Sequence, residues 1–299
     1  MDITIIDLRR KIYNWILAAR PKTLPAALNP VIVGTSIAIY YDKFHFIAAL
    51  IALLCSLLFQ IGANFTNDLF DYLHGADKKE RTGPQRVVAS GLISIDEMKT
   101  GIIITFGLSF LLGLYLVYLG GWFIFLIGVL SIITAIAYTA GPFPLAYHAL
   151  GDLAVFIFFG FAGTIGTYYV QAHEFEPLAF WASIPVGALI TNILVVNNYR
   201  DIEEDKLSNK NTLAVIIGEK LTRLQYLFFV VVSYLILFIV YFLYKKNLII
   251  FLPLLSIPLS IKLIKMIYTL KGKELNKTLE LTAKFSIIYG LLFAAGIIL

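Results

Sequence analysis

The chain has 299 residues, of which 59% are hydrophobic and only 14% are charged. Soluble domains carry about 25% charged residues, so this composition excludes an ordinary soluble enzyme. It also excludes a disordered chain, because there is ample apolar surface to bury. The formal net charge is +5, but in a membrane protein the location of the charges matters more than their sum. A single cysteine, Cys55, excludes an internal disulfide and a cysteine-rich metal site.

The first 22 residues mix basic side chains with spaced apolar ones. Ile5, Leu8, Ile12 and Ile16 would fall mostly on one side of a helix, which is typical of a short helix that lies in the membrane interface. No small-residue cleavage site follows a short apolar core, so we expect no signal peptide.

Nine further stretches are apolar enough for a membrane-spanning helix, which needs about 20 residues. They are 24–41, 47–66, 99–118, 121–140, 150–170, 178–197, 222–243, 247–268 and 281–298. We therefore expect an all-α, polytopic membrane protein with nine transmembrane helices around a central cavity. The whole chain, 1–299, is expected to form one domain, with four helices over about 24–140 and five over about 150–298.

The basic residues predict the orientation of these helices. With the N-terminus inside, 21 of the 24 Lys and Arg residues lie on the inner side, and Lys43, Lys245 and Lys246 lie outside. Inner loops of membrane proteins are enriched in Lys and Arg, so this split predicts an N-in/C-out protein. We expect a multi-pass protein of the cell membrane whose active site faces the cytoplasm, with the lipid bilayer and no nucleic acid as a partner.

Acidic and amide side chains gather where the second predicted helix ends. Asn64, Asn67, Asp68 and Asp71 are followed by Asp77 in a short stretch. If the helix continues, Asn64, Asn67 or Asp68, and Asp71 share one face, because residues three, four and seven apart lie above one another. The segment therefore predicts a row of oxygen ligands on one helix face.

A second segment repeats this pattern at the end of the sixth predicted helix. Asn197, Asp201 and Asp205 are spaced four residues apart and share a face, and Asn198 and Arg200 lie between them. Stacked carboxylates repel each other, by about 4 kcal/mol for a pair of unit charges 4 Å apart at an effective dielectric constant of about 20. A hard divalent cation removes this cost, and oxygen ligands suit Mg²⁺. Ordinary solvated loops are the alternative, but two such segments on the same side disfavour it.

Basic residues accompany both acidic segments on the predicted inner side. Arg groups grip phosphate with two hydrogen bonds, and Lys groups act as point charges. Acids and bases together at one membrane face predict a site for a metal-bound polyanion. The candidate phosphate-binding residues are Arg20, Lys22, Arg81, Arg86, Asn198, Arg200 and Lys210.

At these residues the chain resembles the UbiA superfamily of intramembrane aromatic prenyltransferases. The first motif of that superfamily, Asn-Asp-x-x-Asp-x-x-x-Asp, matches at Asn67, Asp68 and Asp71, but its last position is Gly75 and Asp77 lies two residues beyond. The second motif, Asp-x-x-x-Asp, matches at 201–205. The resemblance covers essentially the whole chain.

Within the superfamily, the chain is most similar to the 1,4-dihydroxy-2-naphthoate polyprenyltransferases of menaquinone synthesis. The stretches that carry this likeness lie at 20–25, 75–86, 138–142 and 197–201, and the run 210–214 extends the last of them. In this subgroup the Gly75 variant of the first motif is expected. The likeness implies a prenyl diphosphate and a naphthoate acceptor as substrates, with loss of the acceptor's carboxylate as carbon dioxide.

The resemblance also implies roles for individual residues. Mg²⁺ is the implied cofactor, with ligands expected from Asn67, Asp68, Asp71, Asp201 and Asp205. Catalysis is expected from Asp71, Asp201, Asp205 and Tyr138. Supporting roles are expected for Arg20, Asn64, Asp77 and Asn197. An interfacial tyrosine without a catalytic role is the alternative for Tyr138.

Two other functions compete with this reading. Another branch of the superfamily would use 4-hydroxybenzoate, a porphyrin-type acceptor or a glycerol ether. A transporter or channel would also have many helices and paired acids in the membrane. However, transport sites lie near the bilayer midplane, whereas these acids lie at helix ends, so the pattern favours an enzyme.

Overall fold

The computed structural model describes residues 3–76 and 82–299, and every named element in these ranges is helical. The elements before the middle of the chain are α1 (Ile3–Ala19), α2 (Pro25–Tyr40), α3 (Phe46–Leu73), α4 (Ile95–Ala137) and the turn η1 (Leu145–Tyr147). The next are α5 (Gly151–Val155), η2 (Phe156–Ala162), α6 (Gly163–Ala172), α7 (Pro177–Arg200) and α8 (Ile202–Leu207). The last are α9 (Leu213–Tyr244), η3 (Leu248–Ser256), α10 (Ile257–Thr269), η4 (Gly272–Glu274) and α11 (Leu275–Ile298).

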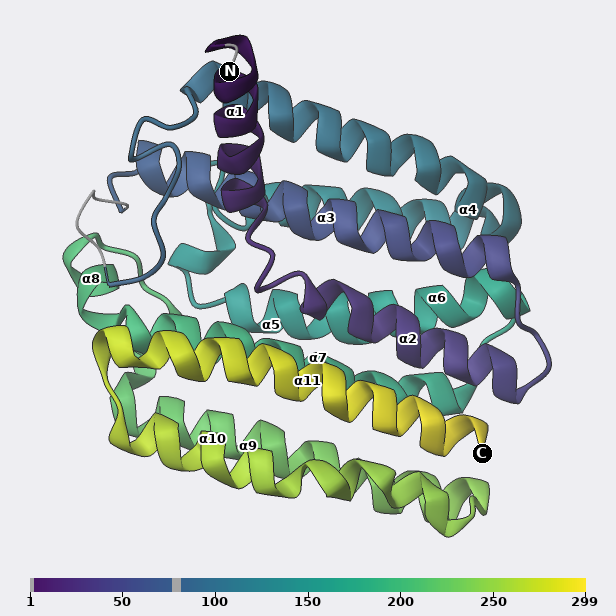
Figure 1. The fold of residues 1–299 in the computed structure, drawn as a ribbon. Helices are drawn as coiled ribbons and strands as arrows, with labels where there is room; N and C mark the ends of the chain where they lie inside the picture. The colour runs from purple at the N-terminus through teal and green to yellow at the C-terminus, as the bar shows by residue number, and fades with distance from the viewer. Residues whose placement is uncertain (1–2, 77–81) are drawn as a thin grey trace.

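Among the described residues, seven helices are long and apolar enough to cross a membrane. The count of nine spans stays a prediction, for two reasons. The stretch predicted at 24–41 forms α2, which has only 16 residues. The stretches predicted at 99–118 and 121–140 both lie within α4, where Gly121 has φ 64° and ψ −155°. Glycine adopts this conformation without steric cost, and Figure 1 shows the chain turning back on itself within α4.

The long helices run side by side, and the segments that follow α4, α7 and α10 gather at one end of the bundle (Figure 1). The carboxyl ends of α3 and α7 meet at this end, together with α8. Helix α1 stands across the bundle at the same end (Figure 1). The two acidic segments, 130 residues apart in the chain, therefore come to the same end of the molecule.

Helix α3 is longer than predicted, and this extension builds the site. It continues to Leu73 rather than ending at residue 66, so both amides and both carboxylates of the first acidic segment are helical. His45 begins the helix by accepting a hydrogen bond from the backbone N–H of Ala48, 3.1 Å away. This cap satisfies one of the backbone donors that a helix start leaves open.

Close packing holds η2 against α7, the helix that carries the second acidic segment. A Cβ atom at Gly187 would lie 3.1 Å from the Cα atom of Gly160 and 2.8 Å from the carbonyl oxygen of Phe156. Small residues let helices approach closely in membranes, where packing replaces the hydrophobic effect as the main attraction. Residues Phe156–Ala162 form a π-helical stretch, a local widening that is frequent at functional sites.

Candidate functional site

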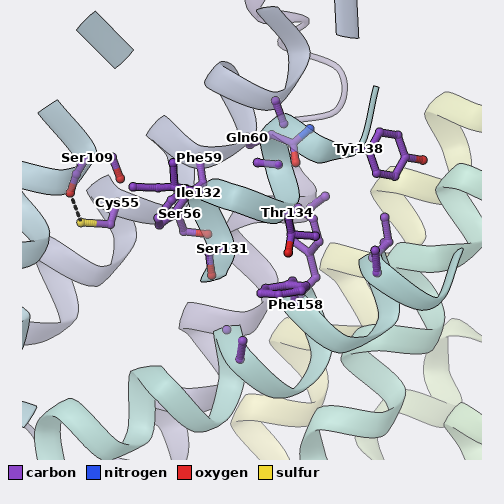
Figure 2. A pocket seen from close by; sticks show the side chains of 18 of the residues that line it. Cys55, Ser56, Phe59, Gln60, Ser109, Ser131, Ile132, Thr134, Tyr138 and Phe158 are labelled. Carbon is purple, nitrogen blue, oxygen red and sulfur yellow. Dashed lines mark hydrogen bonds between the residues drawn. The ribbon is translucent and has the colours of Figure 1, made fainter. Parts of the chain in front are cut away.

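A cavity of about 350 Å³ lies among α2, α3, α4, η2, α6 and α7. Along α3 its wall extends from Asp71 to Ala52, nineteen residues apart, which is about 28 Å of helix. The end near Asp71 is polar, and its lining includes Arg20, Asn64, Asn67, Arg86, Tyr138, Thr139, Asn197, Asn198 and Lys210. The remainder is mainly apolar, and Figure 2 shows the middle of the cavity with Phe59, Ile132 and Phe158 among its walls.

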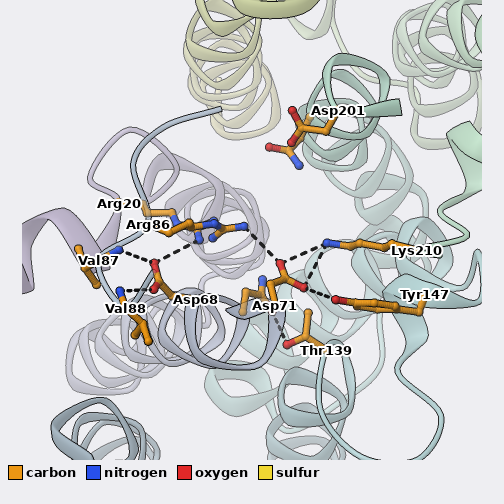
Figure 3. A network of polar contacts seen from close by, with 12 residues as sticks. Arg20, Asp68, Asp71, Arg86, Val87, Val88, Thr139, Tyr147, Asp201 and Lys210 are labelled. Atoms are coloured by element: carbon orange, nitrogen blue, oxygen red, sulfur yellow. Dashed lines mark hydrogen bonds and ion pairs between the residues drawn. The ribbon is translucent and has the colours of Figure 1, made fainter. Parts of the chain in front are cut away.

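Asp71 is the centre of the polar end. Its side chain is buried, and one carboxylate oxygen accepts a hydrogen bond from the Tyr147 hydroxyl at 2.9 Å. The Nζ atom of Lys210 lies 3.2 Å from both oxygens, and Arg86 donates from NH2 at 3.3 Å. Figure 3 shows these donors arranged around the carboxylate. One buried acid thus holds two cations at the polar end of the cavity.

Asp68 has a different environment from Asp71, although both lie on α3. Its two oxygens accept hydrogen bonds from the backbone N–H groups of Val87 and Val88, at 3.2 and 2.9 Å, and Arg20 lies 4.0 Å away (Figure 3). Asp68 is 1% exposed and is not part of the cavity lining. It therefore fixes the loop that presents Arg86 to the site.

The two amides of the first segment face the cavity. Asn67 accepts a hydrogen bond from the Thr139 hydroxyl at 3.0 Å, and Asn64 donates to the carbonyl oxygen of Ala19 at 2.9 Å. Asn64 also lies 3.4 Å from the Thr23 hydroxyl. These contacts tie α3 to the end of α1, to the turn between α1 and α2, and to the segment directly after α4.

In the second segment, Asp201 forms a buried ion pair with its neighbour. The Nε and NH2 atoms of Arg200 lie 2.7 and 2.6 Å from the two oxygens of Asp201. Arg200 also donates to Asn197 and Asn276, both at 2.9 Å. Such a two-point pair has fixed geometry, and both side chains are at most 5% exposed. Asp205, on α8, is also buried, and its backbone oxygen accepts from the Lys210 N–H at 2.9 Å.

Asn198 faces the cavity and is held from behind by Asp152 on α5. The Asn198 amide lies 3.4 Å from one Asp152 oxygen, and Gln225 on α9 donates to the other at 2.7 Å. Three helices therefore meet at one buried carboxylate. No local sequence pattern pointed to Gln225.

The remaining candidates are distributed as follows. Lys22 is exposed and pairs with Glu280 at 3.2 Å, so it does not line the cavity. Tyr138 lines the cavity directly after α4. Asp77 and Arg81 lie outside the described residues. Sequence reasoning missed Tyr147, a partner of Asp71, because the loop after α4 has no helical spacing to reveal which residue faces the site.

The model of the UbiA prenyltransferase family matches residues 27–288. The chain belongs to the UbiA prenyltransferase family. It is 38% identical over 294 residues to the 1,4-dihydroxy-2-naphthoate octaprenyltransferase of Escherichia coli, covering 95% of each chain. It is 34% identical to the Haemophilus influenzae protein of the same name, covering 98% of each.

The solved structures agree on the fold. A UbiA homologue from Archaeoglobus fulgidus, described as bound to GPP and Mg²⁺, superposes with a TM-score of 0.67 at 20% identity, covering 95% of this chain and 99% of that one. This chain is therefore a membrane prenyltransferase of the UbiA fold, and the transporter alternative is set aside.

A magnesium site needs hard oxygen donors, and the charged end of the cavity offers several. Within the described residues, no three Asp, Glu, His or Cys side chains converge on one point. Mg²⁺ that binds a phosphate substrate is usually held by one or two carboxylates, with water and phosphate oxygens completing its shell. Asp71 with Asn67 on α3, and Asp201 at the end of α7, lie at the same end of the bundle (Figure 3). These hard oxygen donors suit Mg²⁺, and water and substrate phosphate oxygens would complete its coordination shell.

Proposed function

We propose that this chain transfers a polyprenyl group from a prenyl diphosphate to 1,4-dihydroxy-2-naphthoate, with loss of carbon dioxide. Both bacterial relatives are 1,4-dihydroxy-2-naphthoate octaprenyltransferases, which supports this acceptor. The observation that carries the proposal is that one cavity joins a cluster of paired charges to a long apolar arm. A prenyl diphosphate has the same two parts, a polyanionic head and a hydrocarbon tail.

The diphosphate head is proposed to bind where Arg86 and Lys210 flank Asp71. Both cations line the cavity and are already oriented by that carboxylate. A carboxylate that holds cations in place lowers the cost of arranging them when substrate arrives, which is the advantage of a preorganised site. Arg20 lines the same end and adds a third positive group.

The metal is proposed to be Mg²⁺, held by Asn67 and Asp71 from α3 and by Asp201 and Asp205 from the second segment. When bound, Mg²⁺ would neutralise negative charge that develops on the leaving diphosphate. Asp68, part of the predicted ligand set, is proposed instead to hold the 86–88 loop through its two backbone hydrogen bonds.

The reaction balances without a base that removes a proton from carbon. The bond between the allylic carbon and the diphosphate oxygen breaks, and the diphosphate leaves with the electron pair. The naphthoate carbon that bears the carboxylate forms the new carbon–carbon bond. The carboxylate then leaves as carbon dioxide, and its bonding electrons restore the aromatic ring. The residues therefore need to bind, orient and stabilise charge, and Tyr138 is proposed to contact the acceptor rather than to deprotonate it.

The apolar arm is proposed to hold the prenyl tail. Burial of each methylene group from water is worth about 0.8 kcal/mol, so the tail belongs in an apolar channel or in lipid. Phe158 and Phe159 from η2 line this arm. Their ring faces carry partial negative charge that favours a nearby allylic cation.

The decisive experiment uses purified protein in lipid vesicles with farnesyl or longer prenyl diphosphate, Mg²⁺ and 1,4-dihydroxy-2-naphthoate labelled in its carboxylate. The expected result is release of labelled carbon dioxide together with a prenylated naphthalenediol. Prenylation of 4-hydroxybenzoate, a porphyrin-type acceptor or a glycerol ether, with no release of label, would refute the acceptor and retain the family.

A further inference from the structure

Hydroxyl groups inside the helices of this protein have a common arrangement. Thr105 donates to the carbonyl oxygen of Gly101 at 2.7 Å, and Ser183 donates to that of Ala179 at 2.6 Å. The same bond to the carbonyl four residues earlier is made by Thr66, Thr191, Thr222 and Ser233. This back-bonding lets a polar side chain sit in apolar surroundings without an unsatisfied donor.

Ser131 and Thr134, in the second half of α4, depart from this arrangement. Both line the cavity, and in the described part of the chain no hydrogen bond is formed by either hydroxyl. With Tyr138 they are spaced at three and seven residues, so all three fall on one face of the helix. Figure 2 shows Ser131, Thr134 and Tyr138 following one another along the pocket. A polar stripe therefore runs from the charged end into the apolar arm.

Gln60 on α3 adds a polar group near this stripe. It lines the cavity, and its amide nitrogen makes one long contact of 3.4 Å with the Asn64 oxygen. Gln60 lies seven residues from Asn67, about 10 Å along the helix toward the middle of the bundle. In Figure 2, Gln60 lies on one side of Thr134, and the Phe158 ring lies on the other.

The chemistry of these groups selects a ligand. A diphosphate needs cations, and those lie at the charged end around Asp71. A prenyl tail has no hydrogen-bonding atoms, so it gains nothing from hydroxyl or amide groups. A neutral ring hydroxyl can both donate to and accept from them, and leaving such polar groups unpaired in an apolar cavity is costly.

We infer that Ser131, Thr134 and Gln60 form a subsite that binds the 4-hydroxyl of the aromatic acceptor, the ring hydroxyl that is not next to its carboxylate, with the Phe158 ring beside it. This inference rests on the proposed function, because it places the acceptor of that reaction. The acceptor would then lie between the diphosphate cluster and the apolar arm, where its ring can face the allylic carbon. The ring hydroxyl would be the hydrogen-bonding partner of Ser131 and Thr134, whose hydroxyls do not bond to the helix carbonyl oxygen four residues earlier.

The test compares two ligands and two proteins. The ligands are 1,4-dihydroxy-2-naphthoate, measured by its KM, and 1-hydroxy-2-naphthoate, which lacks one ring hydroxyl, measured by its Ki as a competitor. The proteins are the wild type and the double variant Ser131→Ala/Thr134→Val. A neutral hydrogen bond lost from a buried site changes affinity by about tenfold. We expect the variant to raise the KM of the dihydroxy compound by about tenfold and to change the Ki of the monohydroxy compound by less than about twofold.

Matched variants separate binding from folding. Ser183→Ala removes a back-bonded hydroxyl on α7 that does not line the cavity, and we expect all constants to stay at wild-type values. Thr134→Ser keeps the hydroxyl and is expected to raise the acceptor KM less than Thr134→Val does. The KM for prenyl diphosphate should change by less than about twofold in the double variant, because the substituted groups carry no charge.

The outcomes are distinguishable. Suppose that the wild type is active. If the double variant then changes neither the KM of the dihydroxy compound nor the Ki of the monohydroxy compound, or raises both equally, the subsite is overturned and the proposed function stands. A rise in the prenyl diphosphate KM equal to the rise in the acceptor KM would assign the stripe to the other substrate and also overturn it. A wild type that binds no naphthoate and releases no carbon dioxide would refute the proposed function and the subsite together.

Discussion

The Nζ atom of Lys210 lies 3.2 Å from both carboxylate oxygens of Asp71, although 139 residues separate the two in the chain. Asp71 belongs to the first acidic segment, and Lys210 follows the second. Arg86 and Tyr147 donate to the same carboxylate from two other loops. Four parts of the chain therefore meet at one buried acid, and the response of this cluster to substitution tests the proposed site directly.

Substitution of Lys210 by Met should weaken binding of the prenyl diphosphate. The variant removes a point charge from the polar end of the cavity and keeps the length of the side chain. We expect its KM for prenyl diphosphate to rise by at least about tenfold, as for loss of one charged contact. Steady-state kinetics with each substrate varied in turn measure this effect. Lys206→Met is the matched control, because Lys206 pairs with the exposed Glu203. An equal rise in both substrates' KM would indicate a general structural defect instead.

Asp71→Asn should lower activity in a protein that remains folded, whereas Asp68→Asn should lower stability. Asp71 lines the cavity, so Asp71→Asn should lower kcat by at least about a hundredfold through loss of electrostatic stabilisation, and the protein should remain folded. Asp68 accepts two backbone hydrogen bonds outside the cavity, so Asp68→Asn should cost about 2 kcal/mol of stability. Activity and thermal unfolding in detergent, measured side by side, check both. A stable, fully active Asp71→Asn protein would contradict the proposed role of this carboxylate.

Removal of divalent metal should stop the reaction reversibly. EDTA should reduce product formation to background, and added Mg²⁺ should restore it, because hard carboxylate and amide oxygens at the site suit this ion. The concentration of Mg²⁺ that gives half-maximal rate should rise in Asp201→Asn by at least about tenfold, because Asp201 is a proposed ligand and even loss of a contact that supports a ligand costs about tenfold in metal affinity. Asp96→Asn, which alters an exposed acid at the start of α4, serves as the control. Full activity in EDTA would exclude the metal.

Gly128→Leu should shorten the prenyl chain that the protein accepts. Gly128 lines the cavity, and a Cβ atom there meets nothing within 4 Å, so a larger side chain fills space that the tail would use. Displacement of two methylene groups is worth about 1.6 kcal/mol, so kcat/KM should fall about tenfold for long prenyl diphosphates and little for geranyl diphosphate. Gly107→Leu is the control, because Gly107 also has open space around it but does not line the cavity. An equal loss for all chain lengths would place the tail elsewhere.

The predicted orientation can be tested with single cysteines in a Cys55→Ser background. Leu207 on α8 is 82% exposed at the site end of the bundle, and Leu248 at the start of η3 is 73% exposed. With the site on the cytoplasmic side, a maleimide that does not cross membranes should label Leu248→Cys in intact cells. It should label Leu207→Cys only after the cells are opened. The reverse pattern would invert the predicted topology.

Most of the helices were predictable because their signal is local. A run of about 20 apolar residues needs no information from elsewhere to identify it as a spanning candidate. Residues 178–197 and 281–298 accordingly lie within α7 and α11. The two acidic segments were equally visible, because helical spacing places their members on one face. Local patterns could not show that α3 continues to Leu73 or that α2 is as short as 16 residues, because neighbouring helices decide where a helix ends.

The sequence by itself determined that this is a helical membrane protein with two oxygen-rich segments and a family-specific pattern, since composition, periodicity and motif spacing are properties of the chain alone. Only the tertiary structure decided the partner of each acid. Asp68 and Asp71 occupy neighbouring positions of one motif, yet the first accepts backbone hydrogen bonds from a loop and the second binds Lys210. Their environments differ because side chains three residues apart on a helix point about 60° apart, and the surrounding segments come from distant parts of the chain.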